Sequence, residues 1–295
     1  MKRVLLTGSG GFIGRHLLEQ LSASYDIAAP TSRELDLTHA EPVESYLRKN
    51  DFDVVVHAAT WNATVNSTKD LNLVLEKNLA MFFNLARMHE RYGKLIYYGS
   101  GAEYDREHYV PRMREEYFDT HVPVDQYGFS KYIMAKHTES ATNIVDLRVF
   151  GCFGPYEDWE LRFISNALCK SLHGLPITIK QNVLFDYLWV DDLVRITDWF
   201  MSHDNRHKHY NACTGRSVDL LSLARLIQKV LGMDVPIQLA QSGLKPEYSG
   251  DNSLLLAELP DFKFTDLEES VRRLAKYYAD NLDRIDRKLL LVDKR

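Results

Sequence analysis

The sequence predicts an α/β protein in which a doubly wound parallel sheet is joined to a smaller, mixed α/β lobe. Over the first half of the chain, short β-branched runs alternate with helical patterns, which is typical of βαβ units and a parallel sheet. A glycine-rich turn follows the first of these runs at once, and after Pro155 the elements become shorter and mixed. We therefore expect a Rossmann-type domain over residues 1–155, with strand and helix segments near 184–205, and a second lobe over the remainder of 156–295.

Each expected element follows from the periodicity of its apolar residues. Strands are expected, with helices between them, at Arg3–Thr7, Asp26–Ala29, Asp53–Ala58, Lys94–Gly99 and Ile144–Val149. The helix expected over Leu71–Tyr92 is apolar on more than one side, which indicates that it is covered on several faces. In the second lobe we expect helices at Glu160–Leu172, Asp191–Met201 and Leu220–Leu231, and strand-like pieces at Ile177–Ile179 and Leu184–Trp189. The charge-rich tail from Asp266 to the end is expected to be a solvated capping helix.

Composition excludes several classes of protein. With 295 residues, 45% hydrophobic and 26% charged, the chain has the composition of an ordinary globular protein. Its net charge of −5 argues against a nucleic-acid binder, which needs a basic face. No apolar run reaches the roughly 20 residues that cross a bilayer, so we expect a cytoplasmic protein without membrane contact. Cys152, Cys169 and Cys213 match no zinc spacing, and we expect inert thiols and no metal.

The glycine-rich turn predicts a dinucleotide site. Glycines at three-residue intervals let the chain turn sharply, approach a pyrophosphate closely and pack the following helix against the sheet. The start of that helix also offers unpaired N–H groups and a partial positive charge to phosphates. Because the turn lies between a strand and a helix of the first βαβ unit, we expect a bound dinucleotide. The candidate residues are Gly8, Gly10, Gly11, Phe12, Ile13 and Gly14.

The end of the second strand favours NADP(H) over NAD(H). An acidic residue there would accept hydrogen bonds from the adenosine ribose of NAD. This sequence instead has Ser32 and Arg33, a hydroxyl and a guanidinium that suit a 2′-phosphate. NAD(H) stays open, because a shift of the strand by one or two residues would bring Glu34 to the ribose. Asp36 and Leu37 are expected to meet the adenine ring.

Two tyrosine–lysine pairs are candidates for proton transfer. Tyr127 and Lys131 are four residues apart on an expected helix, so the ammonium lies near the phenol and stabilises its phenolate. Ser100, at the end of the preceding strand, can hold a substrate oxygen. Tyr132 and Lys136 repeat the spacing, but Tyr127 and Tyr132 are five residues apart and face different ways. Only one pair can face the cofactor, and the spacing alone does not choose between them.

Six segments in order resemble the extended short-chain dehydrogenase/reductase family, the NAD-dependent epimerases and dehydratases. They are T-G-S-G-G-F-I-G at Thr7–Gly14, H-A-A-T at His57–Thr60, the serine at Ser100, Y-G-F-S-K at Tyr127–Lys131, L-R-V-F-G-C-F-G-P at Leu147–Pro155 and Y-L-W-V-D-D at Tyr187–Asp192. The resemblance implies that Tyr127 is the acid/base, that Lys131 supports it and binds the nicotinamide ribose, and that Ser100 orients the carbonyl.

The same resemblance extends the expected cofactor site and implies a dimer. Ala58, Ala59 and Thr60 would line the cofactor's path, and Asn78 and Phe150 complete the implied set. His57 is interpreted as a hydrogen-bonded core histidine beneath the third strand. The helices expected at Leu71–Tyr92 and Gln126–Thr142 correspond to the four-helix interface of the family's homodimers.

Within the family, Thr31–Leu37 resembles GDP-L-fucose synthases and related NADPH-dependent 4-keto-sugar reductases, which implies a nucleotide-diphospho-sugar substrate. The epimerising cysteine and histidine of those enzymes fall on Ala102 and Arg162, which do not readily exchange a proton. We therefore expect a 4-reductase without the epimerase step. The expected substrate contacts are Ala102, Glu103, Tyr104, Gly151, Arg162, Phe185 and Trp189.

Two of these substrate positions depart from the family pattern. Gly151 replaces a usual asparagine, and Phe185 replaces an arginine that contacts the diphosphate. Candidate substitutes for that arginine are Arg162, Lys170, Lys180 and Arg216. Two other functions stay open: an NAD-dependent 4-epimerase or dehydratase on the same scaffold, and a non-catalytic dinucleotide sensor or assembly protein.

Overall fold

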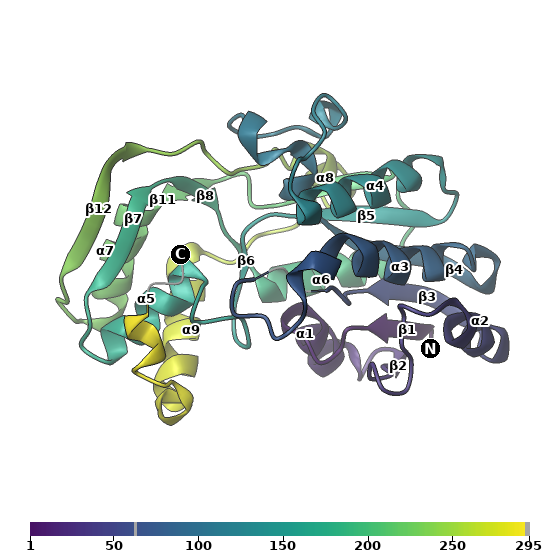
Figure 1. Ribbon diagram of the computed structural model, residues 1–295, viewed down its shortest axis with the longest axis horizontal. Helices are drawn as coiled ribbons and strands as arrows, with labels where there is room; N and C mark the ends of the chain where they lie inside the picture. The colour runs from purple at the N-terminus through teal and green to yellow at the C-terminus, as the bar shows by residue number, and fades with distance from the viewer. Residues whose placement is uncertain (62–63, 293–295) are drawn as a thin grey trace.

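The larger lobe is built on a six-stranded parallel sheet (Figure 1). The computed structural model describes residues 1–61 and 64–292. The strand order is β10-β5-β4-β3-β1-β2. Its strands are β1 Arg3–Thr7, β2 Asp26–Ala28, β3 Phe52–His57, β4 Tyr92–Ser100, β5 Ile144–Val149 and β10 His209–Ala212. The order reverses at β1, and in such sheets ligands bind outside the carboxyl ends of the strands at the reversal.

Helices cover both faces of this sheet. On one face, α1 Phe12–Leu21 and α6 Val190–Ser202 pack around Leu17, Leu193 and Phe200. On the other face lie α2 Ala40–Lys49, α3 Val74–Ala86 and α4 Gln126–Ser140, with Phe82 and Leu85 at the centre of the core. The sheet is therefore doubly wound, as the alternation of strand and helix patterns predicts.

The smaller lobe is mixed α/β (Figure 1). Strand β7 Ile177–Asn182 pairs with β12 Ile237–Leu244 in parallel, and β8 Leu184–Asp186 pairs with β11 Ser217–Asp219 in antiparallel. Its helices are α5 Phe163–Leu172, α7 Leu220–Leu231 and α9 Leu267–Asp280, and a short parallel pair, β6 Cys152–Phe153 with β9 Leu188–Trp189, joins the two lobes. Helix α7 shows why these residues form a helix: Asp219 caps its start, and Gly232 ends it with a left-handed conformation.

Short 3-10 turns complete the chain. They are η1 Leu71–Leu73, η2 His89–Arg91, η3 Gly101–Tyr104, η4 Arg106–His108, η5 Glu115–Tyr117, η6 Leu282–Arg284 and η7 Leu289–Leu291. One further helix, α8 Ser253–Glu258, packs on β10. Thus residues 209–212 and 253–258, which the sequence analysis places in the second lobe, belong structurally to the large one. Among the described residues, no helix is long and apolar enough to cross a bilayer.

Two expected helices differ from the structure. The helix expected to reach Tyr92 ends at Ala86, because the chain turns through η2 and enters β4 at Tyr92. The tail beyond Asp266 is not one solvated helix: α9 ends at Asp280 and buries Val271, Leu274 and Tyr278 in the core of the second lobe. The last three residues, 293–295, lie outside the described part of the chain.

A row of polar side chains crosses the large sheet. Strand register aligns Thr7, His57, Tyr97, Asp146 and His209 on five neighbouring strands. Neighbours in register on parallel strands face the same side, here the side of α3 and α4, since Phe82 packs on His57 and Tyr97. Buried parallel strands usually carry apolar side chains at such positions. This row lies beneath the carboxyl edge of the sheet.

Candidate active site

The turn between β1 and α1 is held by glycines in close backbone contacts. Gly8 has φ +74°, and its carbonyl accepts the N–H of Gly11 at 2.9 Å. A Cβ on Gly8 would lie 2.5 Å from the Ala59 nitrogen, and one on Gly14 would lie 2.1 Å from the Gly8 oxygen. Gly10 differs, because nothing lies within 4 Å of its Cβ position. A ligand therefore has room at Gly10, whereas Gly8 and Gly14 hold the turn against β3.

Helix α1 offers unused N–H groups at this turn. It begins at Phe12, and its N-cap, Gly11, provides no side-chain cap. The first N–H groups of such a helix are free to bind an anion, and the helix dipole favours negative charge there. Phe12 and Ile13 are partly exposed beside the turn. The arrangement fits the pyrophosphate of a dinucleotide.

The loop after β2 has a guanidinium facing solvent. Ser32 and Arg33 are exposed, and within the described residues the Arg33 side chain makes no hydrogen bond or ion pair. Glu34 folds back onto Thr31, whose backbone N–H and hydroxyl donate to the carboxylate at 2.8 and 2.9 Å. These hydrogen bonds lower the pKa of Glu34. They also hold its carboxylate, which could otherwise accept a hydrogen bond from a ribose, against Thr31.

The other expected adenine contacts are only partly accessible. Asp36 accepts from the backbone N–H and hydroxyl of Thr38 and pairs with His39, so its carboxylate already has partners. Leu37 is 7% exposed and belongs to the core beneath α2 and α3, where its carbonyl accepts from Asn84. The adenine ring can therefore meet the outer edge of this segment, with the leucine side chain below it.

Asn78 and Phe150 support the cofactor region from inside the protein. Asn78, 3% exposed on α3, accepts from the Trp61 N–H at 2.8 Å and from the Thr60 hydroxyl at 3.2 Å. It thereby fixes the loop after β3, where Ala58 and Ala59 meet the glycine turn. Phe150 is 2% exposed and packs behind the Ser100 loop rather than at its surface.

Ser100, Tyr127 and Lys131 come together at the carboxyl end of β4. Asp125 caps α4 by accepting the N–H of Gly128, which puts Tyr127 in the first turn. A Cβ on Gly128 would lie 2.9 Å from the Ala102 oxygen, so this turn packs directly on the Ser100 loop. Lys131 is 6% exposed, and its Nζ donates to the Tyr98 carbonyl at 2.7 Å and lies 5.7 Å from the Tyr127 ring centre.

The second tyrosine–lysine pair lies on the outer side of α4. The Tyr132 hydroxyl donates to Asp119, and Lys136 pairs with Asp119 and Glu139. Both side chains are partly exposed. Tyr132 and Lys136 are thus held by surface carboxylates, whereas Lys131 is buried against β4 and lies beside Tyr127.

His57 lies beneath the site as a neutral core residue. Its Nδ1 is 2.8 Å from the Thr7 hydroxyl, and the side chain is 3% exposed. Burial, together with the charge of Lys131, lowers the pKa of His57 to about 3. The interpretation as a hydrogen-bonded core histidine is confirmed.

Two expected substrate contacts face the protein interior instead. Glu103 is fully buried and accepts from the Ser100 N–H and the Arg148 Nε. Tyr104 is 1% exposed; its hydroxyl donates to Asn211 and accepts from Arg148. Because these partners occupy the side chains, Glu103 and Tyr104 support the serine loop and do not line a substrate pocket. Ala102 is also buried, at 2% exposure.

Gly151 and Trp189 likewise have structural roles. A Cβ on Gly151 would lie 2.5 Å from the Asp186 oxygen, so glycine is required by the close approach of the two chain segments. Trp189 is 4% exposed and packs on Phe153 in the core of the second lobe. Both residues were expected at the substrate, and both are packed in the structure instead.

Aromatic side chains from both lobes face Ser100. Phe185 is partly exposed and lies 5.3 Å from Tyr248, ring centre to ring centre. Tyr248 also contacts Tyr109, and its hydroxyl lies beside the Ser100 loop, 2.6 Å from where a Cβ on Gly101 would stand. Sequence reasoning missed Tyr109 and Tyr248, and no local signal marks them: each is a single tyrosine in a polar segment. Burial raises the pKa of both phenols, so both are neutral.

The candidate cations for a diphosphate are not equivalent. Lys170 is 8% exposed and donates to the Thr178 hydroxyl at 2.7 Å, which makes it part of the second lobe's interior. Arg162, Lys180 and Arg216 are exposed. Arg162 is close enough to influence the Tyr248 phenol, and Arg216 follows the Thr214–Gly215 turn that Asp186 holds.

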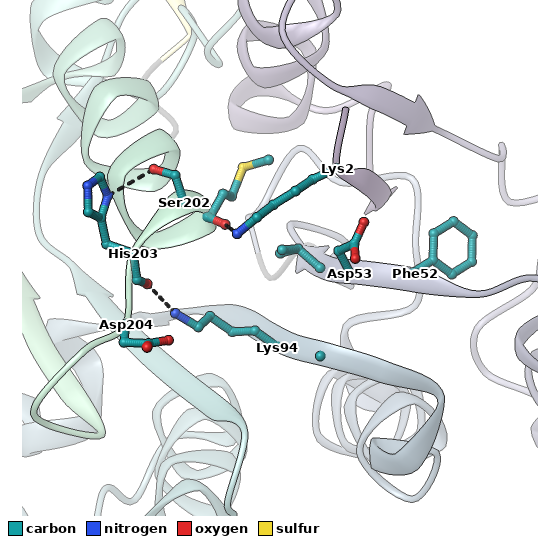
Figure 2. A pocket seen from close by; sticks show the side chains of 10 residues that line it. Lys2, Phe52, Asp53, Lys94, Ser202, His203 and Asp204 are labelled. Carbon is teal, nitrogen blue, oxygen red and sulfur yellow. Dashed lines mark hydrogen bonds between the residues drawn. The ribbon is translucent and has the colours of Figure 1, made fainter.

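A separate cavity of about 300 Å³ lies at the opposite end of the sheet (Figure 2). Its lining includes the starts of β3 and β4 and the end of α6. Lys2 donates to the Met201 carbonyl at 2.9 Å, and Lys94 donates to those of Phe200 and His203 at 3.1 and 2.5 Å. The lysines cap the carboxyl end of a helix, where cations are favourable. This cavity is distant from Ser100 and is explained by helix capping.

The three cysteines are free thiols. Cys169 and Cys213 are fully buried, and Cys152 is partly buried. Burial raises the pKa of each thiol, which keeps it protonated and unreactive. The expectation of inert thiols is confirmed.

Comparisons with known proteins agree with this geometry. Residues 4–213 match the NAD dependent epimerase/dehydratase family. GDP-L-fucose synthase from Sinorhizobium fredii is 24% identical over 254 residues, which cover 78% of this chain and 80% of that protein. GDP-L-fucose synthase from Azorhizobium caulinodans is 51% identical over 59 residues, and this match spans 20% of the chain and 19% of that protein.

Solved structures share the fold across both lobes. A GDP-L-fucose synthetase from Naegleria fowleri bound to NADP has a TM-score of 0.82 at 15% identity, covering 96% of this chain and 95% of that one. UDP-glucose 4-epimerase from Thermotoga maritima, solved with UDP-glucose, has a TM-score of 0.78 at 20% identity, covering 95% and 99%. At these identities the likeness shows the fold.

Proposed function

Because the chain belongs to the NAD dependent epimerase/dehydratase family, we propose that it is an NADPH-dependent reductase that acts on the 4-keto group of a nucleotide-diphospho-4-keto-6-deoxy sugar, with a GDP-sugar favoured. The observation that carries the proposal is the meeting of Ser100, Tyr127 and Lys131 at the carboxyl end of β4. Strands β1, β3 and β4 are neighbours in the sheet, so these residues and the glycine turn share one edge.

The residues at this edge fit an NADP(H) molecule. The open position at Gly10 and the uncapped start of α1 suit the pyrophosphate. The exposed Arg33 guanidinium suits a 2′-phosphate, and Glu34, the acid that would favour NAD, is bound to Thr31. When bound there, the cofactor supplies a hydride to the sugar carbonyl carbon.

Residues of the chain bind the carbonyl oxygen of the sugar and supply the proton that it receives. The Ser100 hydroxyl oxygen already accepts the Ala102 N–H, which leaves its hydrogen to donate. The Tyr248 hydroxyl lies beside the same loop, and we place the substrate oxygen that accepts this hydrogen near it. Tyr127 gives its phenolic proton to the oxygen as charge develops on it, and the Lys131 ammonium stabilises the resulting phenolate.

The side chains around Ser100 favour reduction without epimerisation. Epimerisation beside a keto group needs a residue that removes a proton from carbon and another that returns one. Ala102 has no titratable group and is buried, and Arg162 is permanently charged. Phe185, Tyr109 and Tyr248 form an aromatic wall suited to the face of a sugar ring. Arg162 is exposed and influences the Tyr248 phenol, and Arg216 is exposed next to the turn that Asp186 holds, so we assign these two arginines to the diphosphate.

We further propose a homodimer through α3 and α4. Leu75, Leu79 and Phe83 repeat at four-residue intervals on α3, and all three are partly exposed. Phe129 and Ile133 do the same on α4. The two helices pack on each other, so these residues form an apolar face that a second copy would cover as a four-helix bundle. Sedimentation at micromolar concentration tests this proposal, and a monomer would reject it.

The test of the enzymatic proposal is NADPH consumption with 4-keto sugar nucleotides. Tyr127→Phe is expected to lose turnover and to keep NADPH binding, because only the acid is removed. Tyr132→Phe, on the outer side of α4, is the matched control and is expected to behave as wild type. Near-normal turnover by Tyr127→Phe would refute the catalytic assignment. Interconversion of sugar epimers without net NADPH consumption would identify an epimerase, and binding without any conversion would identify a sensor.

A further inference from the structure

A charged cluster lies fully buried beneath the candidate catalytic serine. Glu103, Asp146 and Arg148 are each 0% exposed. Asp146 belongs to the polar row that crosses the sheet, and Arg148 follows it by two residues on the same side of β5. The mechanism proposed above uses none of the three. Burying this many charges is costly, and such groups are retained where their arrangement has a purpose or full compensation.

Glu103 accepts hydrogen bonds on both of its oxygens. Its Oε1 accepts the Ser100 backbone N–H at 3.0 Å, and its Oε2 accepts the Arg148 Nε–H at 2.7 Å. The Ser100 hydroxyl in turn accepts the Ala102 N–H at 3.1 Å, which closes a capping box around η3. Glu103 therefore connects the backbone of the serine directly to a guanidinium on β5.

The Asp146 carboxyl lies beside the Glu103 carboxyl. A Cβ on Gly99 would lie 2.1 Å from Asp146 Oδ1 and 2.3 Å from Glu103 Oε1, so the two oxygens converge on one point. Glycine at position 99 makes room for this approach. Asp146 Oδ2 accepts from Arg148 Nε at 3.1 Å, whereas Asp146 Oδ1, the oxygen beside Glu103, is buried and receives no N–H or O–H donor from the described residues.

Charge balance requires one proton in this pair. Two neighbouring carboxyls share one guanidinium and are fully buried, and such a pair does not ionise twice. Burial raises the pKa of both carboxyls, the charge of Asp146 raises that of Glu103 further, and Arg148 opposes the rise at both. Because both Glu103 oxygens accept from N–H groups, the hydrogen-bond pattern puts the proton on Asp146.

Within the part of the chain that the structure describes, no second cation is hydrogen-bonded or ion-paired to the two carboxyls. The titratable groups that face it are Lys131 on α4, Tyr97 on β4, Tyr104 on η3, Glu115 on η5 and His209 on β10. Lys131 donates a hydrogen bond to the Tyr98 carbonyl, and Glu115 accepts one from the Asn211 N–H. Burial lowers the pKa of His209 to about 4, so it is neutral.

We propose that Glu103 is a positioning residue for the catalytic serine, acting as the ionised member of a carboxyl pair in which Asp146 keeps the proton. The inference rests on the proposed role of Ser100. Glu103 does not touch the substrate; it fixes the backbone from which the Ser100 hydroxyl projects, and Arg148 fixes Glu103. A displacement of the serine by about 1 Å is enough to lower the rate of the chemical step strongly.

Two isosteric variants separate the partners. A glutamine at position 103 has one acceptor oxygen and must point its amide hydrogens at Ser100 or at Arg148, which both donate. An asparagine at position 146 can donate to Glu103 as the protonated aspartate does. We therefore expect Glu103→Gln to lower kcat by about 10- to 100-fold with unchanged NADPH affinity, and Asp146→Asn to keep most of kcat.

The pH dependence gives a readout that packing alone would not change. An acid whose pKa is raised in the folded state stabilises that state at low pH, and this stabilisation is lost as pH rises through the folded pKa. Wild type is expected to lose thermal stability on the alkaline side as Asp146 ionises beside Glu103. Asp146→Asn lacks this titration, so its melting temperature should fall less over the same range.

Ser100→Ala separates failure of this inference from failure of the proposed function. If Ser100→Ala and Tyr127→Phe both turn over normally, the proposed function itself is wrong. If Ser100→Ala is inactive while Glu103→Gln is fully active, only the positioning role is refuted. If Asp146→Asn is as impaired as Glu103→Gln, or loses stability with pH as wild type does, the proton is not on Asp146. Should Glu103→Gln not fold, the Asp146→Asn measurements still decide the protonation state.

Discussion

Glutamate 157 provides a quantitative test of the electrostatics. Its side chain is buried, at 6% exposure, and it accepts a hydrogen bond from the Ser165 hydroxyl on α5. Burial raises the pKa of Glu157 from its ordinary value of 4.5 to about 8. The folded protein therefore holds a proton at neutral pH that the unfolded chain has released. We predict that Glu157→Gln, which needs no proton, stabilises the protein at neutral and alkaline pH.

The size of the effect follows from linkage. Between pH 4.5 and 8 the folded state binds more protons than the unfolded state, so the free energy of unfolding of the wild type falls as pH rises. Each pH unit above the unfolded pKa lowers the free energy of unfolding of the wild type by about 1.4 kcal/mol. Relative to the glutamine variant, the wild type therefore loses about 3 kcal/mol by pH 7 and about 4 kcal/mol by pH 8. The glutamine oxygen can still accept from Ser165. At roughly 2–4 °C per kcal/mol, the melting temperatures should differ by roughly 10 °C at pH 8.

Thermal melts of wild type and Glu157→Gln between pH 5 and 9 measure this difference. The two curves should lie close together at pH 5 and separate as pH rises, with the variant higher. Glu90→Gln, an exposed position on η2, is the matched control and should follow wild type. The Glu103–Asp146 carboxyl pair is present in all three proteins, so its contribution to the pH dependence of the melting temperature is the same in each. Parallel melting curves for wild type and Glu157→Gln over the whole range would refute the reasoning.

Four further substitutions test the cofactor site and the second lobe. Gly10→Ala and Gly14→Ala should both weaken NADPH binding in fluorescence titrations, but only Gly14→Ala should also lower the melting temperature, since its Cβ would meet the Gly8 oxygen at 2.1 Å. Arg33→Ala should weaken NADPH binding by about 10-fold, the loss of a charge-assisted contact, and leave NADH binding unchanged; equal losses would remove the argument for a 2′-phosphate site. Asp186→Asn should destabilise the protein by about 1–3 kcal/mol in denaturant unfolding, because Asp186 accepts from Thr214 and Gly215 in a buried turn.

Much of the fold could be predicted from sequence where an element is locally specified. Strands β1 and β5 have the expected bounds, and α7 begins and ends at the expected residues. Two features were not predicted, strand β10 and the buried side of α9, and both depend on contacts with distant parts of the chain. Strand β10 is four residues long and joins the edge of a sheet built some sixty residues earlier, and nothing local marks that pairing. The tail was read as solvated from its charges, although α9 has an apolar side that packs on α5 and α7.

The candidate site also combines residues that a local sequence pattern marks with residues that only tertiary packing brings in. The glycine turn and the Tyr127–Lys131 pair could be found because their chemistry requires fixed short spacings. Tyr109 and Tyr248 could not, because Tyr248 reaches the Ser100 loop from a distant segment through tertiary packing, and Tyr109 is placed by its contact with Tyr248. Of the two tyrosine–lysine pairs, spacing alone allowed both. The structure distinguishes them because Asp119, outside α4, holds Tyr132 and Lys136 at the surface.

Glu103 shows why a polar residue beside a catalytic one is hard to interpret from sequence. It lies three residues after Ser100, where a substrate contact is a reasonable expectation. Its actual partner, Arg148, lies 45 residues away, and the contact exists because β4 and β5 are neighbours with a particular register. A shift of one residue in that register would turn Asp146 and Arg148 to the other face of the sheet. Glu103 would then be a buried, unpaired carboxylate, which is costly enough to disfavour that register. The same ion pair that positions the serine therefore also helps to select the alignment of the strands that carry it.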